Sequence, residues 1–116
     1  MGEVTELLPV ERPVVVALLH TQGRGGRAAA LTGAVCAYCD KHELALSDVV
    51  ADLPAGRDAF GELTASLARA RVYGLVVPSR SHLGSASLVA RRGAQLARAN
   101  LRLLVIRANP AASSRC

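Results

Sequence analysis

The run PVVVALL, from Pro13 to Leu19, contains no polar side chain. An unbroken apolar run of this length is typical of a strand that is covered on both faces, whereas a strand with one solvated face alternates. A glycine-rich segment, TQGRGGR at 21–27, follows, and apolar residues then recur at helical spacing to about His42. This stretch therefore predicts a buried strand, a turn and a helix.

The same alternation of elements continues along the chain. Further strands are expected over 44–51, 75–77 and 101–106, with helices from about 60 to 74 and over 83–100. Alternating strands and helices joined by short loops predict an α/β fold. We expect a single three-layer α/β/α domain over 13–107, with a mostly parallel four-stranded sheet in the order 2-1-3-4. Residues 1–12 are expected to be a flexible lead and 108–116 a flexible tail.

Composition limits the class of protein. Hydrophobic residues make up 51% of the 116 residues and aromatic residues only 3%, so the core must consist of Val, Leu and Ala. No apolar run approaches the ~18 residues that span a bilayer. The acidic start MGEVTELLPVE lacks the basic beginning of a secretory signal. We therefore expect a cytoplasmic protein without a membrane partner.

The charge is unevenly distributed. All nine acidic residues lie at or before Glu62, and the nine basic residues after it are all arginine, which gives charges of 5 − 9 = −4 and +9 for the two parts. Such asymmetry indicates a surface that faces a polyanion. The alternative is a compositional bias toward arginine, because 13 of the 14 basic residues are Arg.

The cysteines do not predict a metal or redox centre. The three cysteines of a cytoplasmic chain argue against a disulfide framework. Cys36 and Cys39 form a CxxC with His42 three residues further on, but a zinc site needs a fourth ligand and none is evident nearby. The stretch is typical of a helix interior, so no metal and no cofactor is predicted.

Two loops predict an anion site. Ligands of parallel α/β folds bind beyond the carboxyl ends of the strands, where the strand order reverses. The loops after the first and third strands would meet there, and each leads into a helix whose first N–H groups are free. The candidate anion-binding residues are Arg24, Gly25, Gly26, Arg27, Ser79 and Arg80. The alternative is a flexible turn with solvated arginines, since GRGGR lacks the Lys-Ser/Thr of a P-loop.

The serine-rich loop VVPSRSHLGS, at 76–85, does not predict a self-contained enzyme. A serine near His82 is no hydrolase signature, and no GxSxG elbow is present. Ser79 and Ser85 are more simply explained as turn and N-cap residues. His20, at the end of the first strand, is expected to be partly buried and hydrogen-bonded.

A basic stripe is predicted on the third helix. Arg91, Arg98 and Arg102 would share one face with Gln95, at a spacing that can follow a phosphate backbone. The alternative is a solvated outer face with long side chains lying along it.

The order of the elements resembles the N-terminal catalytic domain of the serine recombinases, the resolvase/invertase family. Segment 52–56, DLPAG, is similar to that family's Asp-x-x-Ser/Ala-Gly loop. Segment 80–85, RSHLGS, stands where the family has Leu-Asp-Arg-Leu-Ser-Arg. The resemblance covers about residues 13–107 and implies a resolvase-like α/β fold, DNA strand exchange and self-association.

The departures from the family's pattern fall on its reactive residues. The nucleophilic Ser is expected at Thr21, or at His20 if the register shifts by one, and the Arg two residues earlier is replaced by Leu19 or Leu18. In the second motif, Ser81 replaces the Asp, and His82 and Ser85 replace the two Arg. Phosphodiester transfer needs an activated hydroxyl and several cations. We therefore expect a catalytically inactive domain that serves as an interaction or regulatory module, with itself or another protein as partner and nucleic acid as a further candidate. Two alternatives stay open: an active domain that uses Thr21, Arg24 and Arg80, and a phosphate- or nucleotide-binding protein of flavodoxin-like architecture.

Overall fold

The sheet is parallel throughout and has the predicted strand order. The computed structural model describes residues 12–21, 25–54 and 58–106. Within these ranges, β1 (Val14–Leu19), β2 (Ala45–Ala51), β3 (Gly74–Val77) and β4 (Arg102–Val105) form one sheet in the order β2-β1-β3-β4. The α/β prediction and the order 2-1-3-4 are confirmed. The predicted lead, apart from Arg12, and the predicted tail lie outside the described residues.

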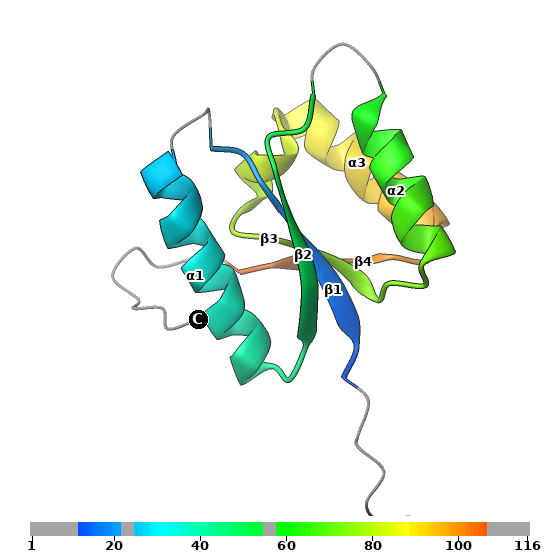
Figure 1. Cartoon of the computed structure of the whole chain (residues 1–116). Coiled ribbons are helices and arrows are strands. Elements are labelled where there is room, and N and C mark those ends of the chain that lie inside the picture. The colour runs from blue at the N-terminus through cyan, green and yellow to red at the C-terminus, as the bar shows by residue number, and fades with distance from the viewer. Residues whose placement is uncertain (1–11, 22–24, 55–57, 107–116) are drawn as a thin grey trace, which may run out of the picture.

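The helices cover both faces of the sheet. Helix α1 (Gly25–Lys41) lies on one side, and α2 (Ala59–Arg69) and α3 (Ala86–Arg98) lie on the other (Figure 1). A short 3₁₀ helix, η2 (Arg80–Leu83), joins β3 to α3. The predicted helix over 83–100 is therefore wrong at its start, since Gly84 separates η2 from α3. Gly84 has φ +115°, a backbone conformation that glycine adopts without strain and that no helix contains.

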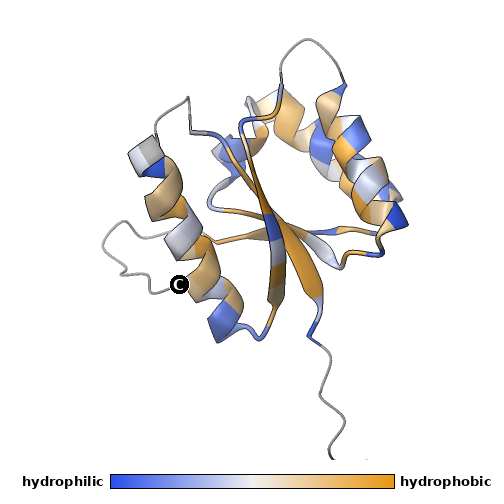
Figure 2. Cartoon of the chain, viewed as in Figure 1, coloured by the Kyte–Doolittle hydropathy of each residue, from blue (hydrophilic) through white to orange (hydrophobic). Residues whose placement is uncertain are grey.

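Strand β1 divides two hydrophobic cores. Val16 and Leu18 pack with the α2 and α3 side, while Val15, Ala17 and Leu19 pack with the α1 side. All five are buried, because β1 is an inner strand with a helical layer on each face. Apolar residues accordingly line the strands, and hydrophilic residues appear on the helices and connections (Figure 2). This two-sided burial is what the unbroken apolar run predicts.

Strand β2 is an edge strand with an irregular register. Val15 pairs with Leu46 but Val16 pairs with Asp48, so β2 carries one additional residue at this point. Leu46 and Val49 consequently both pack on the α1 side, although they are three residues apart. The register beyond this point places Ala51 opposite Leu19, and the Asp52 N–H donates to the Leu19 carbonyl at 2.8 Å. The bulge thus sets which β2 residue reaches the end of β1.

Candidate functional site

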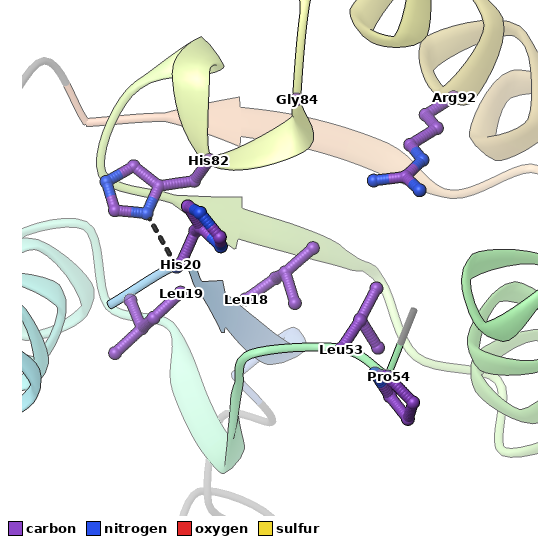
Figure 3. A pocket seen from close by; sticks show the side chains of 8 residues that line it. All are labelled: Leu18, Leu19, His20, Leu53, Pro54, His82, Gly84 and Arg92. Atoms are coloured by element: carbon purple, nitrogen blue, oxygen red, sulfur yellow. Dashed lines mark hydrogen bonds between the residues drawn. The ribbon is translucent and has the colours of Figure 1, made fainter. Parts of the chain in front are cut away.

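The carboxyl ends of β1, β2 and β3 bring four polar residues together. His20 and Thr21 follow β1, Asp52 follows β2, and His82 lies in η2 after β3. The backbone N–H of His20 donates to Nδ1 of His82 at 2.8 Å (Figure 3). The sheet order therefore joins the chain segments after strands 1 and 3, as the sequence predicts.

Thr21 is buried and bound to Asp52 through both of its donors. Its backbone N–H donates to Oδ1 of Asp52 at 2.6 Å, and its hydroxyl donates to Oδ2 of the same carboxylate. Asp52 has φ 60°, in the left-handed region, which Asp adopts more readily than most residues. Thr21 is only 2% exposed. A carboxylate can take a proton from a hydroxyl, but a hydroxyl at this depth is not accessible to a DNA phosphate.

His20 is the accessible member of the cluster. Its side chain is 57% exposed, and Nδ1 lies 3.6 Å from Oδ1 of Asp52. The prediction that His20 is hydrogen-bonded holds for its backbone, whereas the prediction that it is partly buried is wrong for its side chain. The contact of His20 with His82 is made by the backbone N–H of His20 and does not involve its ring. The imidazole therefore stands outside the sheet edge.

Nδ1 of the buried His82 acts as a hydrogen-bond acceptor. The residue is 8% exposed, and its Nδ1 accepts the His20 N–H, so the ring proton belongs on Nε2. Burial lowers the pKa of His82, and electrostatic interactions with Arg27 and His20 lower it further, against a smaller opposing effect of Asp52. If Nδ1 of His82 were protonated, it could no longer accept the His20 N–H. The hydrogen bond that joins the segments after β1 and β3 would then be lost.

We expect stability to depend on pH through His82. The unfolded chain takes up a proton near pH 6.5 and the folded chain only at lower pH, so the free energy of unfolding falls as the pH drops below about 6.5 and levels off below the folded pKa. Urea unfolding between pH 7.5 and 5 measures this slope. His82→Asn, whose side-chain oxygen can replace Nδ1 as acceptor, should flatten the slope, and the exposed His42→Asn should not. Equal slopes in the wild type and His82→Asn would contradict this role.

Among the remaining serine candidates, Ser81 and Ser85 are exposed and Ser79 is partly buried. The Ser79 and Ser81 hydroxyls lie 2.8 Å apart, and the Ser85 hydroxyl lies 3.4 Å from that of Ser87. Ser79 precedes η2 and Ser85 precedes α3, which confirms their N-cap positions, but neither side chain makes a capping hydrogen bond. These serines do not point to an activated nucleophile, because none of these contacts supplies a base.

The predicted anion-binding residues lie on two separate elements. Gly25, Gly26 and Arg27 form the first turn of α1, with Arg27 exposed, and Arg80 is exposed in η2. Arg24 lies outside the described residues. Arg27 acts electrostatically on His82, so its guanidinium belongs to the same edge of the sheet as the four-residue cluster. The anion-binding role of this set stays a prediction.

The three arginines of the predicted basic stripe lie on two different elements. Arg91 and Arg98 are exposed on α3, whereas Arg102 lies in β4 with its guanidinium 5.2 Å from the centre of the Tyr73 ring. The prediction that the three share one helix face is wrong. Helix α3 ends at Arg98, and Asn100 has φ 61°, which turns the chain out of the helix before β4 begins.

A pocket of about 230 Å³ opens beside the four-residue cluster (Figure 3). It is lined by Leu18, Leu19, His20, Leu53, Pro54, His82, Gly84 and Arg92. Arg92 was not predicted as a site residue, although its spacing from apolar residues of α3 indicates an inward-facing position. It lies three residues after Val89 and four before Leu96, so it shares the inward face of α3 with these two apolar residues.

The two cysteines of the CxxC lie within α1 and are not paired with each other. Cys39 is a free, buried thiol, and Cys36 is disulfide-bonded. Burial raises the pKa of the Cys39 thiol, and the neighbouring Asp40 charge raises it further. Cys39 is thus a core residue with little thiolate character.

Comparison of the chain with models of protein families and with curated proteins finds no match. None of the described helices has the length and apolar character needed to cross a bilayer.

Proposed function

We propose that this chain is a resolvase-like α/β domain that does not transfer DNA strands and that acts as a protein-interaction or regulatory module. The observation that carries this proposal is the state of Thr21, the residue at the place of the family's nucleophile. Its hydroxyl is buried and donates to Asp52, so it supports the end of β1 instead of facing a substrate.

The charge beside Thr21 also favours an inactive centre. A phosphoryl-transfer site surrounds its nucleophile with cations that stabilise the charge of the transition state. The charged partner that the Thr21 hydroxyl contacts is the Asp52 carboxylate and not a cation. His20 lies beside Asp52 at 3.6 Å, and the Arg92 guanidinium donates to the Leu83 carbonyl at 2.9 Å.

Contact with nucleic acid enters the proposal only as a non-specific interaction. Arg91 and Arg98 are exposed on α3 and present two permanent positive charges to solvent. Charges of this kind attract a phosphate backbone without reading its sequence, and salt weakens the attraction steeply.

Incubation with supercoiled plasmid DNA tests the inactive assignment. We expect neither nicked plasmid nor a covalent protein–DNA adduct, for the wild type and equally for Thr21→Ser, which supplies the family's own hydroxyl. Thr21→Ala is the matched control, because nicking that persists in this variant does not come from Thr21. Nicking by the wild type that Thr21→Ala abolishes would overturn the proposal.

A further inference from the structure

We propose that the pocket bordered by Leu53 and Pro54 after β2, by η2 and by α3 binds a small organic carboxylate, with Arg92 as the group that holds its negative charge. This site goes beyond the proposed function and does not depend on it, since neither Thr21 nor the exposed arginines of α3 line the pocket.

The walls of the pocket suit a ligand with a short apolar body. Apolar surface comes from Leu18, Leu53 and Pro54, while the polar groups come from Arg92, His20 and His82 on different elements (Figure 3). More of the pocket surface is apolar than polar, and an apolar lining with a small number of polar groups is the usual composition of a small-molecule site. The volume of about 230 Å³ lies below the roughly 300–1,000 Å³ of pockets for drug-sized ligands. The ligand is therefore a compact molecule.

Arg92 is held in position before any ligand arrives. One of its nitrogens donates to the Leu83 carbonyl at 2.9 Å, and its guanidinium lies 4.9 Å from the centre of the buried Phe60 ring. The hydrogen bond and the ring contact fix the guanidinium plane, so little side-chain entropy is lost on binding. A guanidinium has five N–H donors, and those not used by Leu83 remain for a ligand.

The guanidinium and the apolar wall together suit a carboxylate. The guanidinium of Arg92 matches a planar monoanion such as a carboxylate with two parallel hydrogen bonds. The apolar wall formed by Leu18, Leu53 and Pro54 adds a preference for a carboxylate with a short hydrocarbon chain.

Titration of the ¹⁵N-labelled protein at constant ionic strength tests this site. The probes are acetate, butanoate, butanamide and inorganic phosphate, which vary the chain length, the charge and the type of anion. We expect saturable shifts of amide signals around the pocket with butanoate, and affinity lower by about tenfold or more for butanamide, which lacks the charge. Acetate should bind more weakly than butanoate because it leaves the apolar wall uncovered. Equal affinity for butanoate and butanamide, no saturation with butanoate, or tighter binding of phosphate would each overturn the proposal.

Two variants test whether Arg92 is the residue that binds the carboxylate charge. Arg92→Gln keeps a donor for the Leu83 carbonyl but removes the charge, so butanoate affinity should fall by about tenfold or more. Arg91→Gln removes an exposed charge one residue away on α3 and should leave the affinity unchanged. Equal losses in both variants would overturn the assignment to Arg92. The comparison of butanoate with butanamide uses the wild type alone. It therefore tests whether binding depends on the negative charge of the ligand even where Arg92→Gln does not fold.

Discussion

Replacing Asp52 with alanine is expected to lower the free energy of unfolding by about 3–5 kcal/mol. The change removes the acceptor for both donors of Thr21, and Thr21 is too deeply buried for water to replace it. An unsatisfied buried donor costs about 1–3 kcal/mol, and alanine at φ 60° adds about 1 kcal/mol. Urea unfolding followed by circular dichroism measures the loss.

Two control variants separate the contributions to the Asp52 effect. Asn100 also has a left-handed backbone, at φ 61°, so Asn100→Ala measures the conformational cost by itself, about 1 kcal/mol. Asp52→Asn keeps an acceptor and a residue that tolerates this conformation, and should lose less than Asp52→Ala. A loss in Asp52→Ala no larger than that in Asn100→Ala would show that the carboxylate does not support Thr21.

Replacing Gly74 with valine is expected to cost about 3 kcal/mol or more. A Cβ atom at Gly74 would lie 2.5 Å from the carbonyl oxygen of Arg102. Gly74 pairs with Arg102 in the β3–β4 ladder, so the obstacle is the backbone of the neighbouring strand and no flexible side chain can move aside. The β3–β4 pairing must shift, or the first pair of the ladder must open. Thermal and urea unfolding of the variant measure the effect.

Gly93 provides the matched control for Gly74. It lies inside α3, and a Cβ atom there would meet nothing within 4 Å. Gly93→Ala should therefore stabilise the protein by about 0.5–1 kcal/mol, because alanine loses less backbone entropy in a helix. If Gly74→Val were as well tolerated as Gly93→Ala, β4 would not lie where the structure places it.

Periodicity was sufficient to predict the fold. The unbroken run at 13–19 identified the strand between two helical layers, and the alternation of elements predicted the parallel sheet. The order 2-1-3-4 was expected from the type of fold, because alternation alone does not fix the strand order. Errors arose where one residue interrupts a periodic pattern. The apolar spacing continues through Gly84, and only the left-handed φ of that residue separates η2 from α3. Arg102 likewise continues a helical spacing by number, although the chain has already left the helix at Asn100.

The candidate site was predictable in its location and less so in its chemistry. The meeting of the loops after the first and third strands was predicted from the topology, whereas Thr21 and His82 were singled out through the family resemblance. Asp52 follows the second strand by the same rule, but its contact with Thr21 depends on the bulge in β2, which the sequence does not reveal. Arg92 was missed because an arginine on an apolar helix face is expected to reach solvent, whereas here Phe60 and the Leu83 carbonyl hold it beside the pocket.

We infer that the Thr21 hydroxyl is a structural donor to Asp52 and not a nucleophile. A double-mutant cycle with Thr21→Val, Asp52→Asn and the double variant tests it by measuring the coupling energy of the two side chains in urea unfolding. We expect a favourable coupling on the order of 1–3 kcal/mol, with Thr21→Val alone already destabilising. A coupling near zero, with Thr21→Val as stable as the wild type, would show that the hydroxyl is not held by Asp52 and would contradict the account.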